Sequence, residues 1–479
     1  MSENRKNVGR NVIYQTVYQI LAVITPLITS PYVSRVLGAE GLGEYSFAWT
    51  NALYFTLFAM LGVTNYGVRS IADVQNDKEK RSAVFWNIYA IQAFMTSLML
   101  ILYVLYVCFF VKGNKIPAIT QMLIIVGCAF DVNWYFFGVE KFKLTVTRNI
   151  IVKILTVLSV LIFVNKETGV LGYCIVMALG TFISNAVLIP FLKKEIIFIK
   201  PTWRQIKSHI KPNLVLFIPV LASSIFHIMD KTMLGTISGT TQLGYYMNAD
   251  KVINIPIGII TGLGTVYLPR ITAMRNETDE TQVKNELYKS LELHSFAIFS
   301  LSFGLAAIAN EFSPLFFGPG FDPCAGLIIA FAPAFIFKSY SSYFRTNVLI
   351  PYKKEKQYTI AVIVGAAVNF VANAILIPQC KAMGAVYGTV LAEIAVFLLQ
   401  LYRLPVKISP SRIFSTVIPY CLFGVFMGFA IRSISKLPFK GVILVGIEIL
   451  LGGFAYLIFC VIFWKISGRE NIVKGLLKK

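Results

Sequence analysis

Residues 42–72 read LGEYSFAWTNALYFTLFAMLGVTNYGVRSIA, and residues 243–273 read LGYYMNADKVINIPIGIITGLGTVYLPRITA. The two segments lie 201 residues apart and are identical at eight of their 31 positions. The identities include both ends, because Leu42 matches Leu243 and Ala72 matches Ala273. Each segment contains an apolar run long enough for a helix to cross about 30 Å of hydrocarbon. The pair therefore predicts a duplicated set of membrane-spanning helices.

The whole chain has the composition of a membrane protein, with 56% hydrophobic and 14% charged residues among 479. Apolar runs of about 20 residues or more, each enough for one crossing, occur fourteen times: near 12–35, 44–68, 84–111, 117–138, 144–164, 169–192, 212–234, 242–268, 288–310, 323–349, 357–377, 382–402, 413–432 and 441–464. No polar stretch between them is long enough for a soluble catalytic or nucleotide-binding domain. We expect an all-α integral membrane protein with about 14 transmembrane helices.

The duplication also predicts the domain organisation. Its offset corresponds to six helices, which keeps both copies in the same orientation and makes this a parallel repeat. We expect a lobe of helices 1–6 at 1–205, a lobe of helices 7–12 at 206–405, and helices 13 and 14 with a C-terminal tail at 406–479. Upstream of the repeat, Leu37 and Gly38 pair with Leu234 and Gly235, which predicts four extra residues in the second loop. A central cavity between the lobes would hold a substrate.

Prolines within the predicted spans support that cavity, because broken spanning helices are tolerated where they face protein or a water-filled space. They are Pro26, Pro31, Pro219, Pro256 and Pro333.

The formal net charge of +21 would suggest a nucleic-acid partner in a soluble protein, but here it indicates topology. With the N-terminus inside, 32 of the 44 Lys and Arg residues fall in cytoplasmic segments. The positive-inside rule thus predicts a multi-pass protein with both termini in the cytoplasm.

The sequence lacks the usual signs of enzyme chemistry. The seven Cys form no CxxC pair, and the three His have no metal-ligand spacing with Cys or acids. A phosphate-binding GxxxxGK[ST] loop is also absent, which argues against a built-in ATPase. We expect no metal, no cofactor and no enzymatic activity.

Several charged side chains fall within or beside the predicted spans, where each one costs at least about 2.5–3.5 kcal/mol. Such charges need a partner or a polar cavity. Cations facing one cavity would suit a diphosphate, since Arg offers a bidentate fork and Lys a point charge. The candidate substrate-binding residues are Arg35, Lys153, Lys231, Lys251 and Lys338. The alternative is internal ion pairing, such as Lys231 with Asp250.

An acidic group that takes up and releases a cation would couple transport to an H⁺ or Na⁺ gradient. Asp250, in the second repeat copy, is the first candidate, and Glu393 is the second.

Four segments resemble a known family. PYVSRVLGAEGLGEY at 31–45, YGVR at 66–69 and DVNWYFFGVEKF at 131–142 resemble the bacterial Wzx-type oligosaccharide flippases, as does LGYYMNA at 243–249. These belong to the multidrug/oligosaccharidyl-lipid/polysaccharide superfamily. The resemblance implies a MATE-like fold in the bacterial plasma membrane, a V-shaped central cavity and alternating access. It also implies an undecaprenyl-diphosphate-linked oligosaccharide substrate, moved by a monomer among membrane lipids, with a polysaccharide polymerase as a further partner.

Three other functions compete with this interpretation. A multidrug or cation exporter would share the architecture, yet its cavity should favour acids over lysines. A membrane-embedded polymerase or ligase would need a sizeable outer loop with catalytic groups, and the predicted outer loops are short. A scaffold protein would need no charges within the spans.

Overall fold

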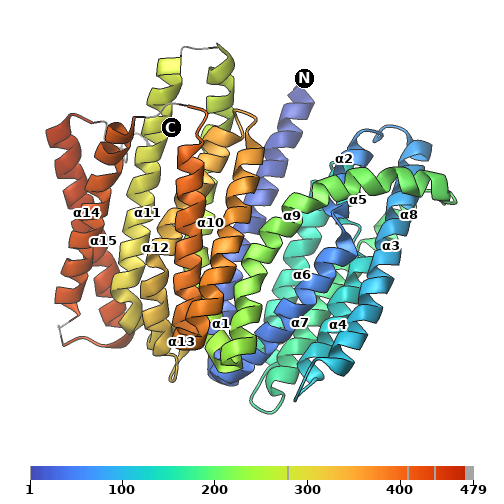
Figure 1. Ribbon diagram of the computed structural model, residues 1–479, viewed down its shortest axis with the longest axis horizontal. Coiled ribbons are helices and arrows are strands. Elements are labelled where there is room, and N and C mark those ends of the chain that lie inside the picture. Colours follow the sequence, from blue (N-terminus) through green and yellow to red (C-terminus); the bar gives the residue numbers. More distant parts are fainter. Residues whose placement is uncertain (1, 278–279, 407–408, 436–437, 470–479) are drawn as a thin grey trace. The chain divides into compact units, whose positions relative to one another are not determined.

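The computed structural model describes residues 2–277, 280–406, 409–435 and 438–469, and the regular structure in these residues is helical (Figure 1). The first helices are α1 (Ser2–Met60), α2 (Val63–Ala72), α3 (Lys78–Phe109), α4 (Ile116–Ala129), α5 (Asn133–Gly138), α6 (Phe142–Phe163), α7 (Gly169–Ala186), α8 (Ile189–Glu195) and α9 (Trp203–Ser238). They are followed by α10 (Thr240–Glu277), α11 (Glu280–Phe317), α12 (Pro323–Phe344), the π-helix η1 (Arg345–Leu349), α13 (Glu355–Tyr402), α14 (Pro410–Ile434) and α15 (Gly441–Ser467).

Eleven helical segments in the described part of the chain are long and apolar enough to cross a membrane. The protein is therefore an all-helical multi-pass membrane protein, although the sequence predicts about fourteen crossings. Two of the eleven, Ile24–Ala72 and Glu355–Tyr402, have 49 and 48 residues, more than twice what one crossing takes. Within them, the long helices α1 and α13 are interrupted by non-helical residues, Gly38 (φ 66°, ψ −176°) in α1 and Lys381 (φ 53°, ψ −129°) in α13. The two numbers differ chiefly because each of these long segments contains two of the apolar runs found in the sequence but is counted as one helical segment in the structure.

The break at Gly38 has a counterpart 201 residues later. Gly239, between α9 and α10, has φ 88° and ψ 169°, nearly the same backbone conformation as Gly38. Positive φ is easy for glycine and strained for other residues. The prediction that Gly235 corresponds to Gly38, with four extra residues, is wrong. The equivalent residue is Gly239, so the offset of 201 holds through the loop, because the turn needs glycine at one fixed backbone position.

Two glycines downstream of these breaks make reciprocal close contacts. A Cβ atom built on Gly43 would collide with the carbonyl group of Thr240, and one on Gly244 would collide with the carbonyl group of Ala39. These are the same contact made twice, since Ala39 and Thr240, like Gly43 and Gly244, are 201 residues apart. Glycine lets the two backbones approach closely, as small residues do at membrane helix interfaces.

The chain forms two compact units, Met1–Gly244 and Tyr245–Lys479. In the first, α4 packs against α1, α3 and α7, while α6 packs against α1 and α7 (Figure 1). In the second, α11 packs against α12, α14 and α15.

The N-terminus of α3 is capped by Asp77, which precedes its first turn. The carboxylate accepts hydrogen bonds from the backbone N–H groups of Lys80 (3.1 Å) and Glu79 (3.0 Å). The backbone donor of Lys80 in particular holds the pKa of Asp77 below its usual value.

Candidate functional site

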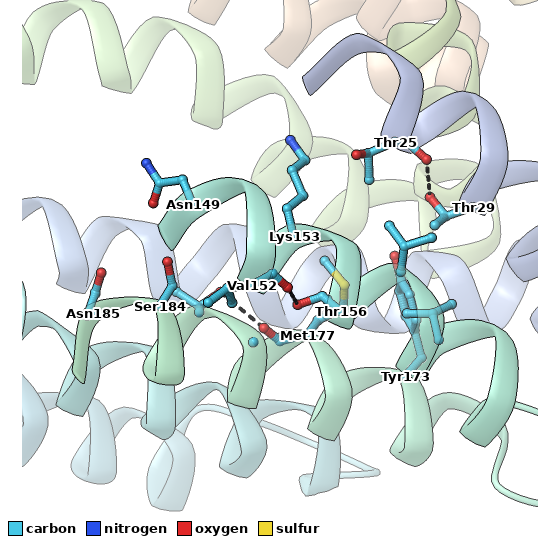
Figure 2. Close-up of a pocket in the computed structure, with 14 residues that line it drawn as sticks. Thr25, Thr29, Asn149, Val152, Lys153, Thr156, Tyr173, Met177, Ser184 and Asn185 are labelled. Carbon is cyan, nitrogen blue, oxygen red and sulfur yellow. Dashed lines mark hydrogen bonds between the residues drawn. The ribbon is translucent and has the colours of Figure 1, made fainter. Parts of the chain in front are cut away.

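A polar cavity of about 260 Å³ opens between α1, α6 and α7 in the first unit. Figure 2 shows Lys153 extending from α6 with its ammonium nitrogen directed away from α7, between Asn149 and Thr25. Most of the other polar groups in the lining are hydroxyls and amides: Thr29, Thr156, Tyr173, Thr181, Ser184 and Asn185. One cation among neutral donors and acceptors suits an anionic or sugar-bearing ligand.

Two threonine hydroxyls in the cavity lining donate hydrogen bonds to backbone carbonyls of their own helices. The hydroxyl of Thr156 donates to the carbonyl of Val152 (2.8 Å), and that of Thr181 donates to the carbonyl of Met177 (3.0 Å). Each hydroxyl oxygen keeps acceptor capacity toward the cavity.

A second cavity, of about 400 Å³, lies between α1, α2, α4, α7 and α9. It shares Thr181 and Asn185 with the first cavity, so one face of α7 contributes to both. Its other polar lining residues are Thr56, Thr64, Asn65, Asp131 and Ser224.

The segment DVNWYFFGVEKF forms a hydrogen-bonded network beside these cavities. Asp131 Oδ1 accepts from the backbone N (3.1 Å) and Nδ2 (2.7 Å) of Asn133. The guanidinium of Arg148, on α6, donates to Asn133 Oδ1 and to the Ser184 hydroxyl (3.1 Å). Arg148 is only 5% exposed. The network thus anchors α6 and α7 to the segment after α4.

Gln92 of α3 ties this segment to a third helix. Its Nε2 donates to the carbonyls of Cys128 (2.6 Å) and Asp131 (2.9 Å), and its Oε1 accepts from Trp134 Nε1 (3.0 Å). Trp134 is fully buried and lies directly against Gly67 of the YGVR segment, where a Cβ would collide with the indole ring. Two of the segments that carry the family resemblance therefore pack against each other.

Sequence reasoning did not single out Arg148. Its position a few residues inside an apolar run could have indicated a buried charge. Because it lies near the predicted cytoplasmic end of that run, it instead counts as a cytoplasmic positive charge. Only the tertiary structure brings Asn133 and Ser184 to it.

In the second unit, Lys338 of α12 and Asp250 of α10 share a partner. Lys338 Nζ donates to Asn254 Oδ1 (3.1 Å), and Asn254 Nδ2 donates to Asp250 Oδ1 (2.7 Å). Asn254 thus links a predicted substrate-binding cation with a predicted ion-coupling acid. Lys251, next in the chain, is half-buried.

Glu393 of α13 is 4% exposed. Tyr358, on the same helix, is within electrostatic range of Glu393 and Arg345. The Arg345 guanidinium lies 4.7 Å from the Tyr358 ring centroid, at the start of η1. Short π-helical turns are frequent at functional sites.

The two remaining predicted cations line neither cavity described above. Arg35 is exposed and donates to the Pro31 carbonyl (3.1 Å) on its own helix. Lys231 is half-buried on α9, and its backbone N donates to Asp230 Oδ1 (2.9 Å).

Comparison with known proteins decides the family. The model of the polysaccharide biosynthesis protein family matches residues 8–275, which is more than half of the chain. The chain belongs to this family. The resemblance indicated by the sequence segments is thereby confirmed.

Curated relatives of this family member include two bacterial proteins. "Putative O-antigen transporter" of Escherichia coli (strain K12) is 23% identical over 409 residues, covering 84% of this chain and 97% of the relative. A protein of the same name from Shigella dysenteriae is 22% identical, covering 78% of this chain and 94% of the relative.

Solved structures show the fold. The lipid II flippase MurJ in an inward closed conformation superposes with a TM-score of 0.77 and 16% identity, covering 96% of this chain and 99% of MurJ. An inward-facing MATE multidrug transporter of the MOP superfamily superposes with a TM-score of 0.58 and 12% identity. The match covers 88% of this chain and 99% of the transporter. The polysaccharide biosynthesis family member therefore has a MurJ/MATE-like fold, as expected from the sequence.

Proposed function

We propose that this protein is a flippase that moves an undecaprenyl-diphosphate-linked oligosaccharide from the inner to the outer leaflet of the bacterial plasma membrane. The family assignment, the names of the curated relatives and the MurJ-like fold support a transporter rather than an enzyme. The observation that carries the proposal is the polar cavity with Lys153 inside a membrane-embedded helix bundle. A cation in a cavity walled by protein attracts phosphate more strongly than the same cation does in bulk water.

We also propose fourteen crossings with both termini in the cytoplasm. The interruptions at Gly38 and Lys381 divide two long segments into two crossings each, and α10 covers the run near 242–268. Two six-helix lobes, at 1–205 and 206–405, then account for the offset of 201. Alternating access by movement of one lobe against the other is the mechanism that this symmetry favours.

Within the substrate site, Lys153 is assigned to the diphosphate. Asn149, Thr156 and Ser184, which line the same cavity, supply hydrogen bonds for phosphate or the first sugar. Arg35, Lys231, Lys251 and Lys338 remain proposed contributors along the substrate's route.

Lys153→Met tests this assignment by removing the charge while keeping a long side chain. A charge-assisted hydrogen bond contributes about 1.5–3 kcal/mol, so we expect outer-leaflet appearance of the substrate to slow by about 10- to 100-fold. The measurement is translocation of a fluorescent undecaprenyl-diphosphate oligosaccharide in proteoliposomes. Lys143→Met is the matched control, because Lys143 lies on the same helix, is exposed and is absent from the cavity lining.

The possible outcomes distinguish a failure of the Lys153 assignment from a failure of the flippase proposal. Equal slowing in both variants, or none in Lys153→Met, would remove Lys153 from the site and leave the flippase proposal standing. If the wild type moves no lipid-linked substrate under any ion gradient but expels a cationic dye, the exporter alternative replaces the flippase.

Asp250→Asn tests the ion-coupling proposal. We expect the variant to lose the acceleration that an imposed H⁺ or Na⁺ gradient gives to wild-type translocation, because an amide cannot bind and release the ion. Glu393→Gln, measured in parallel, should keep the acceleration by the ion gradient if Asp250 is the coupling group. The reverse pattern would assign coupling to Glu393.

A further inference from the structure

A carboxyl group in the second unit is buried without a hydrogen-bond donor among the described residues. Glu448 lies on α15, seven residues after its first residue, Gly441, and is 0% exposed. Both of its carboxylate oxygens lack a hydrogen-bond partner in the described part of the chain. A buried polar atom without a partner is rare in native structures and calls for a physical explanation.

The charged neighbours of Glu448 come from the two helices that pack against α15. Among the described residues, Glu311 of α11 and Arg432 in the last turn of α14 lie within electrostatic range of it. Arg432 Nη1 lies 3.4 Å from Glu311 Oε1, so the arginine is directed to the other acid. The second oxygen of Glu311 is also buried, and it too has no hydrogen-bond partner in the part of the chain that the structure describes.

Arg432 has a further acceptor that draws it away from Glu448. When the amide oxygen of Asn310 faces the guanidinium, it accepts from Nη2 at 2.9 Å and from Nη1 at 3.3 Å. Arg432 is thus the cation near both carboxyl groups, but its hydrogen bonds go to Glu311 and Asn310 and not to Glu448.

Another acid of this unit, Glu292, is held differently. Glu292, also on α11, accepts from the Tyr420 hydroxyl (2.8 Å) and from Arg469 Nη1 (3.0 Å). These two donors satisfy the carboxylate oxygen, as a buried acid in a membrane protein requires. Glu448 has no such donors, and an ionised carboxylate in that setting is far more costly than a neutral carboxyl group.

We propose that Glu448, together with Glu311 and Arg432, forms a proton-binding site, in which Glu448 holds the proton and Arg432 stabilises the carboxylate after release. A proton needs only one oxygen, whereas a metal ion needs several oxygen ligands. The described residues contain no group of three or more His, Cys, Asp or Glu that could hold a metal. The positive charge of Arg432 also disfavours a metal cation.

The site is separate from Asp250 and Glu393 and does not rest on the proposed transport function. Helices α14 and α15 lie outside the duplicated part of the sequence, so the repeat offers no counterpart of Glu448.

Infrared spectroscopy of the full-length protein in proteoliposomes tests the proposal without any transport measurement. We expect a protonated-carboxyl stretch at neutral pH that disappears in Glu448→Gln. The midpoint of its titration should move to lower pH in Glu311→Gln, which frees Arg432 for Glu448, and to higher pH in Arg432→Gln. Glu292→Gln, which removes a partnered carboxylate on α11, should leave the band unchanged.

The opposite results would overturn the site. If Glu448→Gln leaves the carboxyl band intact, Glu448 is ionised and holds no proton. If the band disappears in Glu448→Gln but does not shift in Glu311→Gln or Arg432→Gln, the three residues do not form one site. A merely structural glutamate would not respond in opposite directions to the two neighbouring substitutions.

Discussion

Arg148→Met is expected to lower the free energy of unfolding by about 3–5 kcal/mol, the usual cost of removing one partner from a buried charged network. The substitution removes the donors to Asn133 Oδ1 and Ser184, and the partly buried Asp131 loses the nearby cation. The packing of α6 and α7 against the segment after α4 would loosen as a result. Thermal unfolding in detergent and denaturation with increasing SDS are suitable measurements.

A double-mutant cycle makes the test of the network specific. Asn133→Leu combined with Arg148→Met should cost less than the sum of the two single substitutions, because both disrupt the same interaction. Lys143→Met, an exposed position on the same helix, should change stability by no more than about 0.5 kcal/mol. Strict additivity of the two buried substitutions would show that Arg148 and Asn133 act independently.

Gly43→Ala and Gly244→Ala are expected to be strongly destabilising, although alanine is the better helix former. In each case the added methyl group would meet a main-chain carbonyl group, that of Thr240 or Ala39, which cannot turn aside as a side chain can. Overpacking against side chains costs about 1–3 kcal/mol, and we expect at least that here. The measurement is the yield of monodisperse protein and its melting temperature.

Gly446→Ala is the matched control for these substitutions. It lies in the interior of α15, and an added Cβ would meet nothing within 4 Å. We expect this variant to be neutral or slightly stabilised, by up to about 1 kcal/mol. Because the two contacts are copies of one arrangement, Gly43→Ala and Gly244→Ala should have similar effects. A large effect in one and none in the other would contradict the duplicated contact.

The candidate site could be predicted only in part. The sequence indicated Lys153, Lys338 and Asp250 because charges within apolar runs need an explanation. It could not indicate that Asn254 joins Lys338 to Asp250, since an asparagine in a helix carries no such signal. Nor could it indicate that Glu448 lacks hydrogen-bond donors among the described residues, since this depends on Arg432 being bonded to other groups.

The sequence by itself determined the membrane character, the helical class, the family and the offset of 201. These follow from local composition and from similarity between segments, which need no three-dimensional information. The tertiary structure alone decided that Gly239 corresponds to Gly38, that Arg148 is a buried anchor and that Lys153 lines a cavity. The reason is physical: the hydrogen-bond partners and the cavity wall come from residues distant in the chain, which only folding brings together, and residue type alone does not tell which of several glycines takes the turn's backbone angles.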